Sequence, residues 1–164
     1  KEGMAEGIKL EGGGPYVETV TQLVEAVIPV MGHLGLTPQS INKLGSYRVQ
    51  GREPEAAAEM LREAEMLESS GADMLLLECV PSELAETITS RVSVPVIGIG
   101  AGQACDGQIL VLQDLLGITQ GKTPVFAKNF MQEAKDIPSA IHAYVEAVKQ
   151  RSFPVVNTAS PDCI

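Results

Sequence analysis

Short apolar runs alternate with longer amphipathic stretches along this chain of 164 residues. The apolar runs have the length of strands, and most are nearly continuous, as in strands that are buried on both faces. They predict five strands, at Ile8–Glu11, Ile28–His33, Met74–Cys79, Val94–Gly100 and Pro124–Ala127.

The stretches between these runs carry apolar residues at helical spacing. Pro15 and Pro54 stand where the first turn of a helix accepts proline, and Gly71 stands where a helix commonly ends. Helices are therefore predicted at Val17–Val27, Glu55–Ser70, Pro81–Arg91, Ile109–Leu116 and Ile137–Lys149, with a long polar loop at Gly35–Arg52.

Strands that alternate with helices predict right-handed βαβ units and an α/β fold with a parallel sheet. No linker divides the chain, so we expect part of one domain over residues 1–151. The tail, residues 152–164, is rich in Pro, Asn, Ser and Thr, and it is predicted to be disordered.

Charge and composition narrow the range of partners. The net charge of −9 argues against nucleic acid and against an anionic membrane surface as partners. No apolar run approaches the ~20 residues of a membrane span. The first residues do not resemble a signal peptide, and the three cysteines form no CxxC pair typical of a zinc site. We expect a cytoplasmic protein that acts on a small molecule.

Candidate chemistry lies where the predicted strands end. Glu11, His33, Glu78 and Gly100 each follow an apolar strand. In (β/α) barrels and in open parallel sheets alike, the carboxyl ends of the strands form the ligand-binding edge. We therefore expect these four residues to meet at one rim.

Lys9 and Glu11 are two residues apart on one strand, so they share a face, while Ile8 and Leu10 face the helices. A Lys and a Glu inside a barrel are costly unless they are paired or serve a ligand. One interpretation is a buried ion pair. The other places Lys9 beside an anionic substrate and Glu11 beside a metal.

Glu78 ends the apolar run Met74–Leu77. Poor solvation raises the pKa of a carboxyl group, and a raised pKa suits a general base. Glu78 is thus a candidate catalytic base, although an ion pair or a cap at the rim would also explain it.

Three further features are less specific. His33 is a candidate substrate contact or a hydrogen-bonded structural residue, whereas His142, within the last helix, is predicted to lie on the surface or in packing. The loop Gly98–Gly102 could approach a phosphate group, or could simply leave room for a substrate. The loop Ser46–Arg52 could be a lid, a subunit contact or a plain surface loop.

Seven segments follow one another in a specific order and spacing: Ile8–Gly13, Gly32–Ser40, Tyr47–Arg52, Leu76–Pro81, Pro95–Gly102, Asp106–Val111 and Phe126–Phe130. Together, over about residues 1–151, they resemble the ketopantoate hydroxymethyltransferase family.

The resemblance implies a (β/α)8 barrel of the phosphoenolpyruvate/pyruvate type. It also implies transfer of a hydroxymethyl group from 5,10-methylenetetrahydrofolate to 3-methyl-2-oxobutanoate, giving 2-dehydropantoate for pantothenate synthesis. It implies Mg²⁺ and a large homo-oligomer, often a decamer. By the same resemblance, Lys9 binds the oxo acid, Glu11 helps to hold Mg²⁺, and Glu78 accepts the C3 proton to form a Mg²⁺-stabilised enolate. His33 would contact the substrate or the surroundings of the metal.

The resemblance also implies that the first strands of the barrel, with two metal-binding aspartates, precede Lys1. A full barrel needs about 250 residues, so we expect this chain alone to be an incomplete catalyst. Three other interpretations stay open: another 2-oxo acid aldolase or lyase of the same fold, a non-catalytic scaffold, and a module that binds phosphate at Gly98–Gly102.

Overall fold

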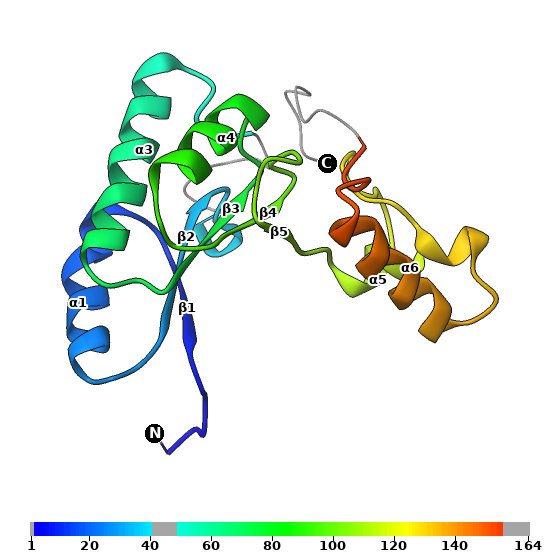
Figure 1. Ribbon diagram of the computed structural model, residues 1–164, viewed down its shortest axis with the longest axis horizontal. Helices are drawn as coiled ribbons and strands as arrows, with labels where there is room; N and C mark the ends of the chain where they lie inside the picture. The colour runs from blue at the N-terminus through cyan, green and yellow to red at the C-terminus, as the bar shows by residue number, and fades with distance from the viewer. Residues whose placement is uncertain (1, 41–48, 156–164) are drawn as a thin grey trace.

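Five parallel strands form one sheet in a computed structural model that describes residues 2–40 and 49–155 (Figure 1). Neighbours along the chain are also neighbours in the sheet, without a reversal of order. The strands are β1 (Ile8–Glu11), β2 (Val30–Gly35), β3 (Met74–Glu78), β4 (Val96–Ile99) and β5 (Gly107–Gln108). The predicted α/β class and parallel pairing are confirmed.

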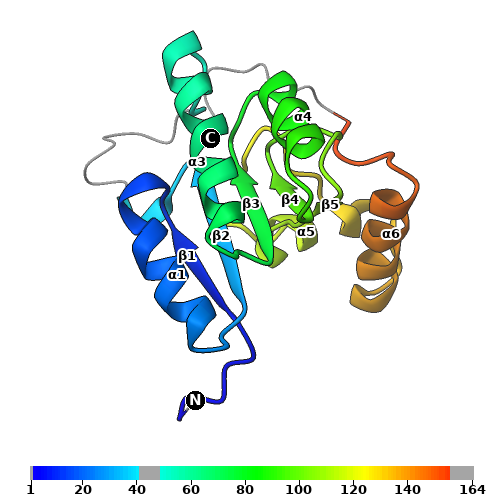
Figure 2. The same cartoon turned by 60° about the vertical axis from the view of Figure 1, so that its left-hand side comes forward.

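Three helices lie together on one face of the sheet, as Figures 1 and 2 show. They are α1 (Val17–Glu25), α3 (Pro54–Ser69) and α4 (Ser82–Arg91), and short 3-10 turns lie at η1 (Gly14–Tyr16) and η2 (Pro38–Ser40). A proline opens α3, as the sequence predicted. The helices and the sheet enclose a core that contains the wholly buried Val20, Leu67 and Ile88.

Alternation along the strands sorts their side chains between two faces. On β3, Leu75 and Leu77 belong to the core under the helices, whereas Leu76 belongs to a second apolar cluster on the opposite face. Ile8 and Leu10 of β1 pack against the helix-side core, as predicted. Because successive strand residues point to opposite faces, Lys9 and Glu11 are left for the other side.

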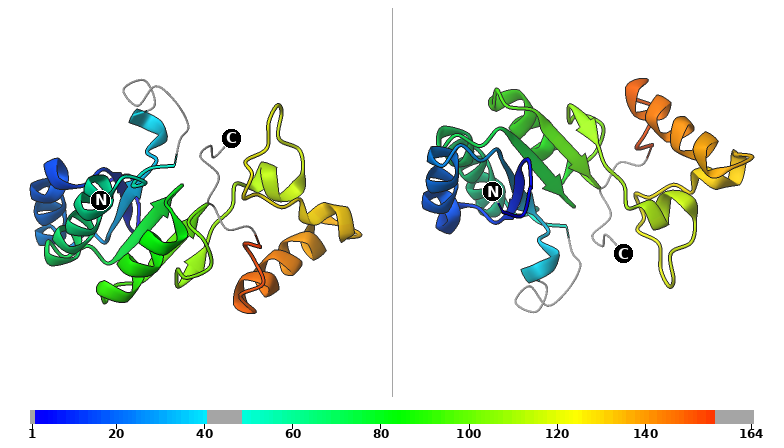
Figure 3. Two further views of the ribbon diagram at one scale, coloured as in Figure 1. Left: turned by 90° about the horizontal axis from the view of Figure 1, so that it is seen from above. Right: turned by 90° about the horizontal axis from the view of Figure 1, so that it is seen from below.

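The last third of the described chain forms a separate group beside the sheet (Figure 3). It contains α5 (Leu112–Leu116), η3 (Phe130–Glu133) and α6 (Ile137–Lys149). Phe130, Tyr144 and Phe153 meet edge to face there, with ring centroids 5.5–5.7 Å apart. The Tyr144 hydroxyl donates to the Gln108 carbonyl at 2.8 Å, which ties this group to β5.

Helix α6 begins with a capping box. The Asp136 carboxylate accepts the Ser139 backbone N–H at 2.9 Å, and the Ser139 hydroxyl contacts the Asp136 backbone in return. The Ser139 hydroxyl also donates to the Asp136 carboxylate, and this bond, together with that from the Ser139 N–H, holds the pKa of Asp136 below its usual range. The predicted bounds of this helix, Ile137–Lys149, are confirmed.

The predicted strand at Pro124–Ala127 is wrong. A turn occupies this segment, with the Ala127 N–H donating to the Pro124 carbonyl at 3.0 Å. The ring of Phe126 is buried in the apolar cluster on the sheet face opposite the helices, called here the open face. Its burial, and not membership of a strand, explains the apolar residue at this position. The fifth strand is instead the two-residue β5, whose glycine and glutamine gave no apolar signal.

Element ends shift by a few residues elsewhere. The second strand covers Val30–Gly35 instead of Ile28–His33, and the helix expected from Ile109 begins at Leu112. The Ile109 N–H donates to the Gly98 carbonyl at 3.0 Å, so Ile109 continues the pairing of β5 with β4.

Among residues 2–40 and 49–155, no helix is long and apolar enough to cross a membrane. The strand order agrees with part of a (β/α) barrel, in which each strand pairs with the next along the chain. Within the same residues, β1 and β5 do not pair with each other, and the sheet is open.

Candidate functional site

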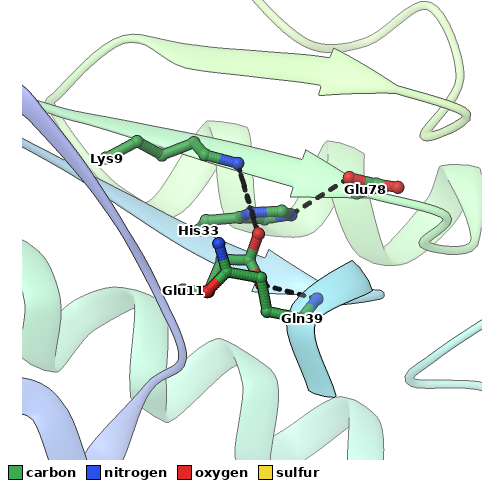
Figure 4. A network of polar contacts seen from close by, with 5 residues as sticks. All are labelled: Lys9, Glu11, His33, Gln39 and Glu78. Carbon is green, nitrogen blue, oxygen red and sulfur yellow. Dashed lines mark hydrogen bonds and ion pairs between the residues drawn. The ribbon is translucent and has the colours of Figure 1, made fainter. Parts of the chain in front are cut away.

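The carboxyl ends of β1, β2 and β3 bring four polar side chains together (Figure 4). The strand register places Glu11 beside His33 and Gly35 beside Glu78. Lys9 precedes Glu11 by two residues and lies on the same face. The four residues that the sequence singled out, Lys9, Glu11, His33 and Glu78, therefore form one cluster.

His33 lies at the centre of this cluster and is wholly buried. Its Nδ1 atom is 3.2 Å from the Lys9 ammonium nitrogen and 3.6 Å from Glu11 Oε1. Its Nε2 atom is 3.3 Å from Glu78 Oε2. The imidazole thus connects the Lys9–Glu11 pair with the carboxylate of Glu78.

The contact with Lys9 bears on where the ring proton of His33 lies. A lysine ammonium can only donate, so a hydrogen bond from Lys9 requires the tautomer in which Nδ1 of His33 accepts and Nε2, on the side of Glu78, carries the ring proton. Within the described residues, Nε2 is the one buried side-chain nitrogen or oxygen without a hydrogen bond. Its contact with Glu78 Oε2 at 3.3 Å is an ion-pair contact that does not meet hydrogen-bond geometry.

Lys9 and Glu11 differ in exposure. The Lys9 side chain is 44% exposed and the Glu11 side chain 13%, with Nζ and Oε1 3.4 Å apart. The other carboxylate oxygen of Glu11 accepts the Gln39 N–H at 3.2 Å, a contact that the sequence did not indicate. Glu11 is held from both sides, while Lys9 keeps access to solvent.

The backbone around Glu78 is tightly constrained. Cys79, the next residue, has a φ of 51°, which is uncommon for a residue with a side chain. The Leu36 N–H donates to the Glu78 carbonyl at 2.8 Å. Gly35 has a φ of 95°, and a Cβ atom there would lie 2.2 Å from that carbonyl oxygen. Only glycine fits, so Gly35 lets β2 approach the end of β3 and fixes the position of Glu78.

The glycine loop after β4 has a packing explanation. A Cβ atom at Gly100 would lie 2.6 Å from the Phe126 ring, and one at Gly102 would lie 2.6 Å from the Ser82 hydroxyl oxygen. Both glycines have positive φ angles. They allow Phe126 and Ser82 to come close to the backbone, so their occurrence does not require a phosphate ligand.

The remaining predicted features are not part of the cluster. His142 is exposed on α6. Of the loop Ser46–Arg52, residues 46–48 lie outside the described residues. In the rest of that loop, Val49 is buried in the open-face cluster and Arg52 is exposed.

A further acidic residue near the end of β1 was missed by sequence reasoning. Glu63 of α3 accepts the Gly14 N–H at 2.9 Å, and its carboxyl group would collide with a Cβ atom at Gly13. The Gly12–Gly14 segment thus allows the chain after β1 to pack closely against α3. Among residues 2–40 and 49–155, no group of three or more His, Cys, Asp and Glu residues is arranged to hold a metal ion.

Comparison with known proteins gives one consistent result. The sequence profile described as Ketopantoate hydroxymethyltransferase matches residues 1–156. A 3-methyl-2-oxobutanoate hydroxymethyltransferase of Alkalilimnicola ehrlichii is 58% identical over 94% of this chain and 56% of its own length. One of Erwinia tasmaniensis is 57% identical over 92% of this chain and 57% of its own length.

The chain spans about half the length of the curated relatives that it matches. Among solved structures, the YdjI aldolase from Escherichia coli K12 covers 97% of this chain and 62% of its own, at 16% identity and a TM-score of 0.42. A likeness of that size supports no argument about this chain.

Proposed function

Because this chain belongs to the ketopantoate hydroxymethyltransferase family, we propose that the whole protein transfers a hydroxymethyl group from 5,10-methylenetetrahydrofolate to 3-methyl-2-oxobutanoate. The product is 2-dehydropantoate, in pantothenate synthesis. The single observation that carries the proposal is the cluster around His33, because it joins a cation, a carboxylate and a candidate base at one edge of the sheet.

In the proposed reaction, Glu78 takes the proton from C3 of the oxo acid. Its side chain is 19% exposed, so it is reachable by a ligand while largely shielded from water. The electrons of the broken C–H bond form an enolate, which attacks the methylene carbon of the folate. Before that attack, water adds to the methylene carbon and both of its C–N bonds break, which releases tetrahydrofolate and leaves the carbon as formaldehyde. The enolate then forms the new C–C bond to this carbon, and the resulting alkoxide takes up the proton that Glu78 removed, giving the hydroxyl group.

Lys9 is the proposed substrate-binding residue. Its ammonium group keeps access to solvent and is oriented by His33 Nδ1. A cation in that place would attract the carboxylate of the oxo acid and stabilise negative charge that develops on its oxo oxygen.

We assign His33 a positioning role in place of direct substrate contact. It is wholly covered, and its two ring nitrogens face Lys9 with Glu11 on one side and Glu78 on the other. By donating from Nε2, it would orient the Glu78 carboxylate toward the substrate.

Glu11 is the proposed contribution of this chain to a Mg²⁺ site. Mg²⁺ in proteins is commonly bound by one or two carboxylates together with substrate and water oxygens. A single, largely buried carboxylate at the edge of the sheet fits that chemistry. When bound, Mg²⁺ would supply Lewis-acid polarisation of the oxo group.

Product formation tests the proposal. The chain would be joined to the remaining portion of the Alkalilimnicola ehrlichii relative, a protein called here the completed protein. It should form 2-dehydropantoate from 3-methyl-2-oxobutanoate, methylenetetrahydrofolate and Mg²⁺. Turnover of pyruvate or oxaloacetate without folate would instead indicate a lyase, and a folded but inactive protein would indicate a scaffold.

We further propose that the completed protein closes the sheet into a (β/α)8 barrel and assembles as a homo-oligomer. Within residues 2–40 and 49–155, the outer edges of β1 and β5 pair with no other strand, which supports closure because unpaired strand edges invite pairing. Light scattering coupled to size-exclusion chromatography would give the assembly mass, and a monomer would refute the oligomer.

A further inference from the structure

A cavity of about 530 Å³ lies directly beside Glu78. Its volume is in the range of small-molecule sites. It lies between the ends of β3 and β4 and the chain from Val111 to Phe126. Much of its wall is apolar, and two of its apolar residues, Val111 and Ile118, are 48% and 64% exposed. Exposed apolar side chains around a cavity are typical of a site that a ligand covers.

Asp114 is the one carboxylate buried within this apolar wall. It belongs to α5 and is 4% exposed, and with His33 it is one of two buried polar or charged residues in the described chain. One of its oxygens accepts the Thr119 hydroxyl. Within the described residues, the other oxygen accepts no hydrogen bond. That oxygen is not a wholly buried atom, and Asp114 lines the cavity, so a ligand there can complete its hydrogen bonds.

The chemistry of this cavity specifies its ligand. Apolar walls favour a flat ring, and a carboxylate pairs best with two adjacent N–H donors in a fork. The ring of an aminopyrimidine carries such a pair, an exocyclic amino group beside a ring N–H. A cation, Lys122, also lines the cavity and is exposed, which suits an anionic tail that extends from the ring.

We propose that this cavity is the subsite for the aminopyrimidine ring of the one-carbon carrier, with Asp114 pairing to its amino group and ring N–H. The inference rests on the proposed function. Glu78 lines the same cavity, so a carrier held there has its transferable carbon on the side of the base. Proton removal by Glu78 and carrier recognition by Asp114 are then separate tasks.

A purely structural role for Asp114 makes different predictions. The Thr119 contact closes the turn after α5, where the Gly117 N–H also donates to the Asp114 carbonyl at 3.1 Å. Asp114→Asn keeps a side-chain oxygen for Thr119 but presents an amide N–H₂ to the donors of the ring. Thr119→Val removes the turn contact and keeps the carboxylate.

Tetrahydrofolate binding to the completed protein, measured by calorimetry, separates these roles. Asp114→Asn should weaken binding by about tenfold or more, as expected for loss of a charged hydrogen-bond partner. Its rate of C3 hydrogen exchange in the oxo acid should stay at the wild-type value, because that step needs no folate. Thr119→Val should bind nearly as well as wild type. Unchanged affinity in Asp114→Asn, or equal weakening in both variants, would overturn the proposal.

A ligand series tests the same point without a substitution. Wild-type protein should bind 2-amino-4-hydroxypteridine at least about tenfold more tightly than 2,4-dihydroxypteridine, which carries an oxygen in place of the amino group. Equal binding of the two would refute pairing with Asp114. If wild type binds the amino compound selectively but exchanges no C3 hydrogen, the proposed function fails while the subsite stands.

Discussion

On the helix side of the sheet, β3 presents Leu75 and Leu77, both wholly buried in the core under the helices. On the opposite side the same strand presents Leu76 and Glu78, and its neighbour β2 presents the buried His33. The helix side of β3 is apolar, while the opposite side of the sheet combines an apolar cluster with charged groups. Alternate residues of one strand can therefore contribute either to the stability of the fold or to catalysis. Substitutions at neighbouring positions should then change either the free energy of unfolding or the turnover rate.

The largest expected effect is a loss of turnover on substitution of Glu78, which lies on the open face. Glu78→Gln should lower turnover by about 10²–10⁴-fold, the usual contribution of a general base. Substrate affinity and the free energy of unfolding should change little, because the amide has nearly the same shape. Glu86→Gln, an exposed change on α4, is the matched control and should keep wild-type turnover. Steady-state kinetics with urea unfolding would measure both quantities.

The second effect is on the helix side. Leu77→Ala should lower the free energy of unfolding by about 2–5 kcal/mol, the range for buried leucines. The fraction that remains folded should keep its exchange rate. Leu112→Ala, at a position 53% exposed, should stay within about 0.5 kcal/mol of wild type. A large loss of stability from Glu78→Gln and a small one from Leu77→Ala would invert the comparison.

The third effect returns to the open face. Lys9→Ala should raise the KM for 3-methyl-2-oxobutanoate by about 10–100-fold, since a hydrogen bond to a charged group contributes about 1.5–3 kcal/mol. Lys149→Ala removes an exposed lysine on α6 and serves as the control. An unchanged KM in the Lys9 variant would remove this residue from the substrate site.

The smallest expected effect is on the pH dependence of stability, and it concerns the N-terminus of α6, away from both faces of the sheet. The pKa of Asp136 is lowered by its hydrogen bonds with Ser139, so this carboxylate adds stability above its ordinary pKa of about 3.9. That contribution disappears as the pH falls through the lowered native value. Asp136→Asn, which can still cap α6, should unfold with a free energy that depends less on pH below about pH 4. Urea unfolding across this range would show the difference, and parallel curves would contradict it.

Burial also changes the reactivity of a cysteine that has no role in the proposed mechanism. Cys105 is a free cysteine, and burial raises the pKa of its thiol to about 11. Its sulfur packs so closely against Gly98 that a Cβ atom there would lie 2.9 Å away. In the native protein this thiol should resist alkylation at pH 8, and become reactive when the protein unfolds.

Sequence reasoning located the cluster because strand alternation is a local property. The two-residue spacing of Lys9 and Glu11, and the polar ends of the strands at His33 and Glu78, were enough to predict one rim. The roles of these residues stay predictions, since geometry alone does not establish turnover.

Other features depend on contacts that a single sequence does not reveal. Phe126 looked like a strand residue because burial in a turn and burial in a strand leave the same apolar signal. Asp114 carried no signal at all, because its burial follows from the way residues 111–126 fold over the ends of β3 and β4. The need for glycine at position 35 became clear only from the position of the Glu78 carbonyl.

Deuterium exchange at C3 of 3-methyl-2-oxobutanoate, followed by NMR in D₂O with Mg²⁺, tests the central claim most directly. The completed protein should exchange this hydrogen, the Glu78→Gln variant should not, and both should bind the oxo acid with similar affinity. Exchange at the wild-type rate in the Glu78→Gln variant would contradict the assignment of Glu78 as the base.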